Sequence, residues 1–146
     1  MSAKFNFKRP DRFDAIRAEK GVDHTIIGQN GFNYGTFKTS LFDDNTKIYR
    51  LALERYFREY GKNPEASSDT AGVYLFVMMF LHDWSGVLDA DGNEVPFSKE
   101  AAYAYFSENA LEDAWLYNEL LTRSRDVDNY QAVGDPRASK KAAAGN

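Results

Sequence analysis

The chain has 146 residues, a net charge of −4 and no cysteine, and 43% of its residues are hydrophobic. This composition predicts a folded protein with its own core, and it excludes disulfides, thiolate metal sites and a cysteine nucleophile. The longest apolar run, residues 72–81, is too short to cross a bilayer, and the N-terminus lacks the apolar core of a signal peptide. We therefore expect a cytosolic protein without membrane contact.

The charges are unevenly distributed along the chain. Residues 83–128 contain eleven acidic and three basic residues, a net charge of −8. Twelve basic and ten acidic residues give +2 in residues 1–82, and three basic and one acidic give +2 in residues 129–146. Without a concentrated basic face, nucleic-acid binding is not expected. The asymmetry permits head-to-tail self-association or docking to a basic partner, although a merely solvated acidic surface would also explain it.

The N-terminal part of the chain predicts an arm followed by a folded domain. Residues 1–10 are polar and indicate a flexible arm, and residues 11–126 are expected to form a single domain. We assign the fold as mainly α within the α+β class: a small helical domain with a short N-terminal β-hairpin. The first helix is expected over residues 11–20, with Gly21 as its stop.

The β-hairpin is predicted from two β-like segments, residues 25–27 and 34–39. Between them lies Asn30-Gly31, a dipeptide typical of tight turns. A two-stranded element is marginal by itself, so we expect it to lie against the helices.

Two long helices should follow. The first, from about residue 46 to 60, places apolar residues on one side and a basic stripe containing Arg50 and Arg58 on the other. This stripe could meet a partner or could be a solvated helix face. The second helix should begin at Ser67 or Ser68 and end at residue 82 or 84. Its middle is apolar on every side, so we expect it to be the central buried helix.

Residues 84–97 predict a small hairpin between the central and C-terminal helices, with Asp91-Gly92 as its turn. Trp84 lies at the corner, where its ring could anchor the hairpin to the helices or bind a partner. We treat Trp84, Gly86, Gly92 and Pro96 as the structural anchors of this segment.

The C-terminal half predicts a short helix capped by Ser98 and a last helix over about residues 110–126, begun by a capping box at Asn109. Apolar residues spread around most of the last helix, so either two neighbours bury it or part of it is a docking surface. Residues 127–146 are expected to form a disordered tail. The candidate partner-binding residues are Trp115, Tyr117, Leu120, Tyr105, Phe106, Arg50 and Arg58.

Signals for catalysis and for cofactor or metal binding are weak. His24 and His82 lie among apolar residues without a partner at metal-ligand spacing, which favours structural or surface roles. Residues 89–93 are similar to the opening of a calcium loop, but the glycine is fourth rather than sixth. A hairpin turn is therefore the better interpretation. We predict no catalytic, cofactor or metal site and no enzymatic activity.

The chain resembles the tail assembly chaperones of long-tailed bacteriophages over about residues 20–130. The resemblance rests mainly on Trp84-Ser85-Gly86-Val87, Asp89-Ala90-Asp91-Gly92 and Val95-Pro96-Phe97-Ser98. Thr36-Phe37-Lys38, Asp44-Asn45 and the helix over 48–60 add to it. The N-terminal arm and first helix depart from the family pattern.

The resemblance implies a non-catalytic protein of the host bacterial cytoplasm that is absent from the mature virion. It would bind the tape measure protein and recruit tail tube subunits. It also implies a longer form made by ribosomal slippage, with Lys140-Lys141 as the candidate site, although two lysines in a polar tail are commonplace. The alternatives are a head–tail connector or tail completion protein of the virion, and a small regulatory protein that binds one host target.

Overall fold

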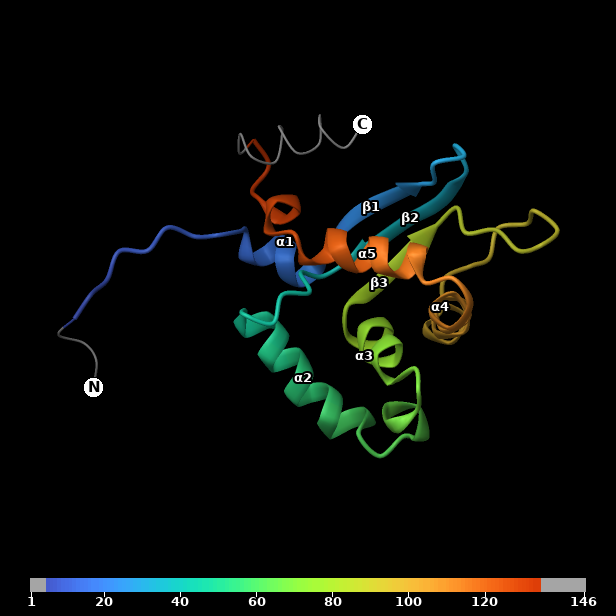
Figure 1. Ribbon diagram of the computed structural model, residues 1–146. Coiled ribbons are helices and arrows are strands. Elements are labelled where there is room, and N and C mark those ends of the chain that lie inside the picture. The colour runs from blue at the N-terminus through green and yellow to red at the C-terminus, as the bar shows by residue number, and fades with distance from the viewer. Residues whose placement is uncertain (1–4, 135–146) are drawn as a thin grey trace.

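The structure is a computed structural model that describes residues 5–134 (Figure 1). Over these residues the fold is α+β, with five α-helices and a three-stranded sheet, rather than mainly helical as expected. In chain order the elements are α1 (Ala15–Lys20), β1 (Val22–Ile27), β2 (Asn33–Thr39), α2 (Lys47–Tyr60), the 3-10 helix η1 (Pro64–Ser67), α3 (Ala71–Met79), β3 (Leu81–Ser85), α4 (Lys99–Glu112), α5 (Trp115–Arg125) and the 3-10 helix η2 (Val127–Tyr130).

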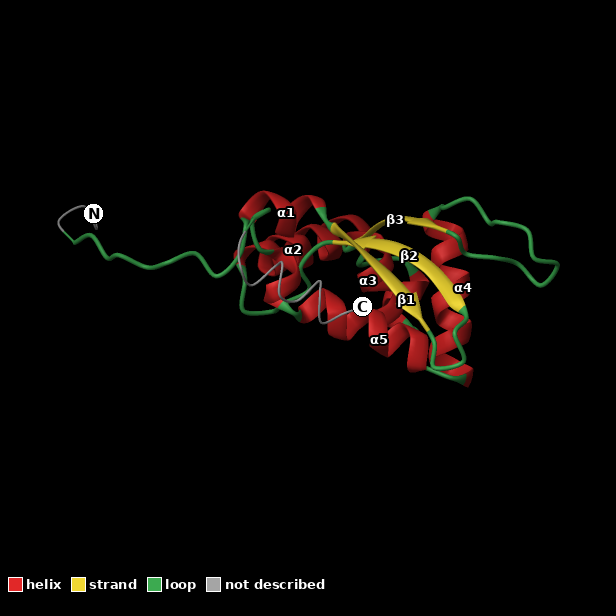
Figure 2. Cartoon of the chain, turned by 90° about the horizontal axis from the view of Figure 1, so that it is seen from above, coloured by secondary structure: helices red, strands yellow, loops and turns green. Residues whose placement is uncertain are grey.

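The sheet is antiparallel in the order β1-β2-β3. The predicted hairpin of β1 and β2 is confirmed, with Val22 opposite Thr39 and Ile26 opposite Gly35. Burial alternates along β1, because one face of the sheet lies on the helices and the other is open. Seen from above, the strands lie over the helices, with the open face toward the viewer (Figure 2).

The third strand, β3, was not predicted, and the expectation of a helix to residue 82 or 84 is wrong. Helix α3 ends at Met79, and the chain turns at once into β3, which pairs with β2 so that Trp84 lies opposite Phe37. An apolar run is consistent with either a buried helix or a buried strand, so periodicity alone cannot locate this boundary.

The start of α3 also differs from the prediction. Residues 64–67 form η1, and α3 begins at Ala71 without a side-chain cap. The hydroxyl of Ser68 instead donates to the carbonyl of Glu65 (2.9 Å), so it closes the preceding turn. Ser67 and Ser68 therefore end the 3-10 helix and do not cap α3.

Helix α3 is the central buried helix, as predicted. Its buried residues are Val73, Tyr74, Phe76, Val77 and Met79. It packs against η1, α2, α4 and β3, and in both views α2 and α4 lie on either side of it (Figures 1 and 2). Tyr74 shows this arrangement directly, because its ring contacts Tyr56 of α2 (6.1 Å between centroids) and Tyr103 of α4 (5.1 Å).

Helix α5 begins five residues later than the capping box predicts, at Trp115 rather than residue 110. Asn109 is inside α4, where its side-chain amide donates to the carbonyl of Tyr105 (2.8 Å) and so does not act as a cap. The chain breaks at Asp113 and Ala114, and the Asp113 carboxylate accepts from the backbone N–H of Trp115 (3.2 Å).

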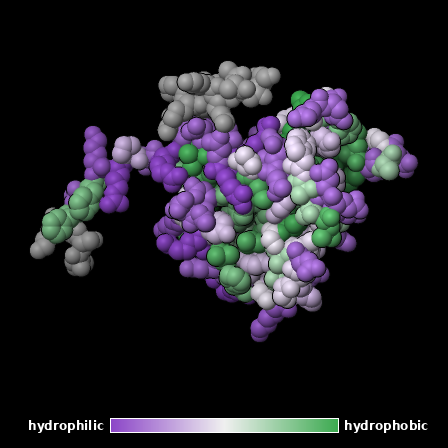
Figure 3. All heavy atoms as spheres, in the orientation of Figure 1, coloured by the Kyte–Doolittle hydropathy of each residue, from purple (hydrophilic) through white to green (hydrophobic). Residues whose placement is uncertain are grey.

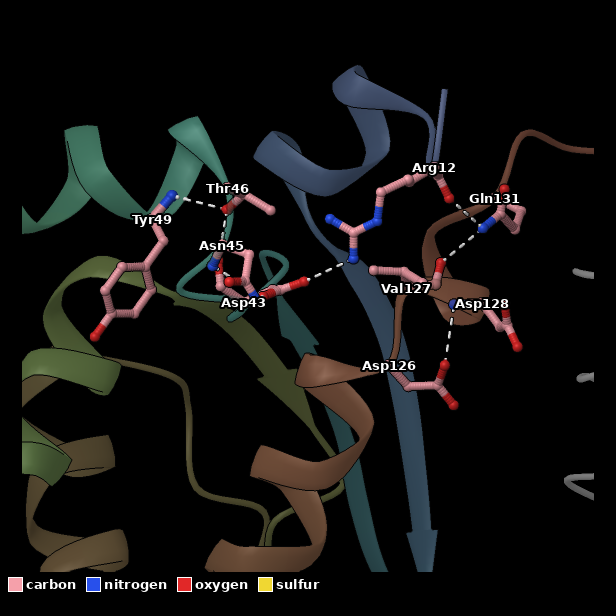
Figure 4. A network of polar contacts seen from close by, with 9 residues as sticks. All are labelled: Arg12, Asp43, Asn45, Thr46, Tyr49, Asp126, Val127, Asp128 and Gln131. Carbon is pink, nitrogen blue, oxygen red and sulfur yellow. Dashed lines mark hydrogen bonds and ion pairs between the residues drawn. The ribbon is translucent and has the colours of Figure 1, made fainter. Parts of the chain in front are cut away.

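Residues 127–131 are part of the fold, so the expectation of a disordered tail from residue 127 is wrong there. Tyr130 is fully buried beside Ala18, Val22 and Leu41. The side-chain amide of Gln131 donates to the carbonyl of Arg12 (2.7 Å), which ties this segment to the region before α1 (Figure 4). The part of the expected tail from residue 135 on, including Lys140-Lys141, lies outside the described residues.

A polar cluster fixes the N-terminal segment to the loop before α2 (Figure 4). Arg12 forms an ion pair with Asp43 (3.1 Å), and the Asp43 carboxylate also accepts from the backbone and side chain of Asn45 (3.0 Å each). Thr46 then caps α2 by accepting from the N–H of Tyr49 (3.2 Å). The segment before this cluster, residues 5–10, is exposed and extends away from the body (Figure 1).

Candidate functional site

Trp84 joins the sheet, the hairpin loop and α4. It is 6% exposed, and its indole N–H donates to the carbonyl of Val95 (2.8 Å). Its ring makes edge contacts with Phe37, Phe97 and Tyr105 at 5.5–6.3 Å between centroids. A buried ring that satisfies its own polar atom in this way is a core residue, and it offers no surface to a partner.

The hairpin loop after β3 follows the predicted turn. Gly92 has φ +84°, and Leu88 pairs with Glu94 across the turn. Gly86 has φ +76° and lies against Gly35 of β2, where a Cβ at Gly35 would be 2.8 Å from the carbonyl oxygen of Ser85. Pro96 is exposed at the end of this loop. These residues shape the loop and the approach of β3 to β2.

His24 belongs to a buried polar cluster that links the sheet to the C-terminal segment. Its Nε2 lies 3.0 Å from the Thr39 hydroxyl and 3.2 Å from the Tyr130 hydroxyl. Ser124 completes the cluster at 2.7 Å from the hydroxyl of Thr39. Burial, followed by the nearby charge of Arg123, lowers the pKa of His24 to about 4. A neutral imidazole enclosed among hydroxyls has a structural role here, because substrate has no access to it.

Lys99 and His82 form a second polar group, at the end of α3. The Lys99 ammonium donates to the carbonyl of Val77 (2.7 Å), in the last turn of α3, and to that of Leu81, at the start of β3. Burial, followed by the charge of Arg55, lowers the pKa of Lys99 to about 8. The imidazole of His82 contacts the Ser40 hydroxyl at the surface.

The seven candidate partner-binding residues do not form one surface. Phe106 and Leu120 are fully buried, which corrects their assignment to a docking face. Tyr105 and Tyr117 are partly buried against the core. Arg50 and Arg58 are exposed on α2, while Trp115 is 40% exposed at the start of α5. The last helix carries apolar residues on more than one side because β1, α4 and η2 all pack against it.

Trp115 belongs to an exposed group of rings that the sequence did not reveal. Its ring lies 5.7 Å from that of Tyr34, which lies 4.9 Å from that of Phe32. Phe32 is 47% exposed at the end of the β1–β2 hairpin. We call these three residues the aromatic corner. Leu111, 70% exposed near the end of α4, lies four residues before Trp115 in the sequence.

Figure 3 shows hydrophobic surface at this hairpin end of the molecule, set among hydrophilic side chains. Three rings in edge-on and tilted contact that stay partly in water make an apolar patch of the kind that marks interaction sites. Tyr and Trp are also the residue types most often found at the energetic centre of protein interfaces. The aromatic corner is therefore the best candidate for a functional site on the chain.

The part of the chain that the structure describes contains no cluster of His, Cys, Asp and Glu side chains able to hold a metal ion. None of its helices has the length and apolar character needed to cross a bilayer.

Comparison with protein families decides the origin of the chain. Residues 43–142, more than half of the chain, match the model of the YdaY prophage protein family. The chain belongs to the YdaY prophage protein family. It is therefore a phage-derived protein, and the match begins just before α2. No curated protein and no solved structure matches the chain.

Proposed function

We propose that this YdaY-family protein is a non-catalytic tail assembly chaperone. In this role it would bind the tape measure protein and recruit tail tube subunits in the cytoplasm of the host. It would be absent from the mature virion. The observation that carries the proposal is the aromatic corner of Phe32, Tyr34 and Trp115, together with the phage origin of the chain.

The string that underlies the resemblance to these chaperones has a structural role. Trp84, Gly86 and Gly92 form the packing and turns of the hairpin loop, as described above. This string therefore supports a shared fold more than a shared contact surface. The binding argument has to rest on the exposed residues themselves.

The aromatic corner suits an apolar helical segment as its ligand. Phe32 and Tyr34 come from the sheet and Trp115 from α5, so the rings are fixed by two packed elements and lose little conformational entropy on binding. An amphipathic helix presents apolar side chains at intervals of three and four residues, which can pack against such rings. By covering such a helix, the chaperone would keep the long, aggregation-prone tape measure protein soluble until tube subunits replace the chaperone.

Co-expression with the tape measure protein of the same phage tests the proposal. We expect the wild-type chain to raise the soluble amount of tape measure protein and to purify with it. Trp115→Ser and Phe32→Ser should each reduce the co-purified amount, because they remove exposed rings. Ile16→Ser is the matched control, since Ile16 is 66% exposed on α1 and lies outside the aromatic corner.

Two results would contradict the proposal. One is a tape measure protein that stays insoluble and unbound with the wild-type chain. The other is equal co-purification by the wild-type chain and both ring variants, which would place binding elsewhere on the molecule.

A further inference from the structure

Helix α2 presents a basic face to solvent. Lys47, Arg50 and Arg58 are exposed and lie on one side of the helix together with the exposed Glu54, because successive members are separated by three or four residues. The face therefore carries three basic side chains and one acidic side chain. Leu51 and Phe57 border this side and are 48% and 63% exposed. Exposed apolar side chains beside unpaired basic ones are typical of a surface that contacts an acidic and partly apolar partner.

Helix α4 presents the opposite charge. Glu108 and Glu112 are exposed on its outer side, and Leu111 between them is 70% exposed. The single basic residue of α4 is Lys99, and its ammonium is turned inward onto the carbonyls of Val77 and Leu81. The outer face of α4 is therefore acidic, with an apolar side chain in its centre.

The two faces lie on opposite sides of the body. Helix α3 separates α2 from α4, and each buries one side toward it, through Tyr56 on α2 and Tyr103 on α4, whose rings both contact Tyr74 of α3 (Figure 1). Within residues 5–134, no ion pair involves Arg50, Arg58, Glu108 or Glu112. Both sets of charges are thus available to a second molecule.

We propose that the basic face of α2 in one copy binds the acidic face of α4 in the next copy. The complementary surface is carried by the chain itself, so a second copy is the occupant that the charges specify. The contact is heterologous, because two α2 faces or two α4 faces would repel each other. A heterologous contact extends into an open array unless its rotation closes the copies into a ring. This proposal does not depend on binding of the tape measure protein.

Charge reversal on each face provides the test. One variant is Arg50→Glu with Arg58→Glu, the second is Glu108→Lys with Glu112→Lys, and the third carries all four changes. Sedimentation velocity should show that the wild-type average mass rises with concentration and falls with added salt, because salt screens exposed charges. Each two-residue variant should associate at least about tenfold more weakly, since like charges then face each other.

The four-residue variant distinguishes a specific contact from a general charge effect. Its faces are exchanged but still complementary, so self-association should return. An equimolar mixture of the two-residue variants should also associate, because each supplies the face that the other lacks. Circular dichroism would show that all variants remain folded, which is expected because the four side chains are exposed.

Several results would overturn the proposal. A wild-type chain that stays monomeric at every concentration is one. Association that survives either two-residue change, or that fails to return in the four-residue variant, is another. A monomeric wild-type chain whose basic face binds a DNA duplex would assign that face to nucleic acid instead.

Discussion

At the scale of single residues, the two tryptophans have different environments: one is a core anchor and the other is a partly exposed surface ring. Trp84 was expected either to anchor the corner or to bind a partner, and its 6% exposure and bond to Val95 make it an anchor. Trp115 is 40% exposed and belongs to the aromatic corner. Composition and spacing cannot distinguish these environments, because the burial of each ring depends on segments distant in sequence. Phe32 and Tyr34 were missed for the same reason.

The two tryptophans should differ in their effect on stability. Trp84→Ala should lower the free energy of unfolding by about 3–5 kcal/mol, because it leaves a cavity and an unpaired carbonyl at Val95. Trp115→Ala is the comparison and should cost less, about 1–2 kcal/mol, since part of its ring is already in water. Denaturant melts measure both values. Equal losses would show that this division of roles is wrong.

His24 should make stability depend on pH. Its pKa is lowered to about 4 in the folded state, so between that pH and its ordinary pKa of 6.5 the unfolded chain binds the proton more readily. Its contribution to stability is therefore complete above pH 6.5 and is lost as the pH falls toward 4, by an amount on the order of 3 kcal/mol.

Melts between pH 4 and 7.5 measure this dependence. Burial, followed by the charges of Lys99, Lys38 and Arg55, also lowers the pKa of His82 to about 4, so two histidines act in this window. His24→Gln removes one of them and should reduce the slope of the curve without abolishing it, even if it lowers stability at every pH. Identical slopes for the variant and the wild-type chain would mean that His24 does not control the effect.

At the scale of elements, the sequence correctly located the turns and helix ends that are marked by glycine-containing turn dipeptides or by a glycine after the helix. Asn30-Gly31 and Asp91-Gly92 marked both turns, and residue 60 was the predicted and observed end of α2. Helix ends within apolar runs were not predictable in this way. Strand β3 forms because residues 81–85 find a pairing partner in β2, and the sequence near them does not encode that partner.

The contact between β2 and β3 requires a glycine at position 35. Gly35 has φ +121°, and a Cβ there would lie 2.8 Å from the Ser85 carbonyl oxygen. Gly35→Ala should therefore combine backbone strain with a steric clash and cost more than about 2 kcal/mol. Gly92→Ala is the matched control, with φ +84° and no atom within 4 Å, and should cost about 1–2 kcal/mol. Urea melts compare the two, and an equal cost would show that the close approach is unimportant.

At the scale of the whole molecule, the fold places its surfaces in a way that no linear pattern shows. The excess of acid in residues 83–128 indicated an acidic half, but it could not indicate that α2 and α4 face opposite sides. The C-terminal segment was taken for a tail because it is polar, yet Tyr130 closes the small core beside α1. Such contacts join residues more than a hundred positions apart, as between Tyr130 and His24.

We propose that the chain acts during tail assembly and leaves before the particle is complete. Quantitative mass spectrometry of two fractions from phage-producing cells tests it most directly: tape measure complexes captured from the lysate, and purified mature particles. We predict that the chain is abundant with the tape measure protein in the lysate and absent from the particles. A fixed number of copies in every particle would contradict this account and would identify the chain as a structural component of the virion.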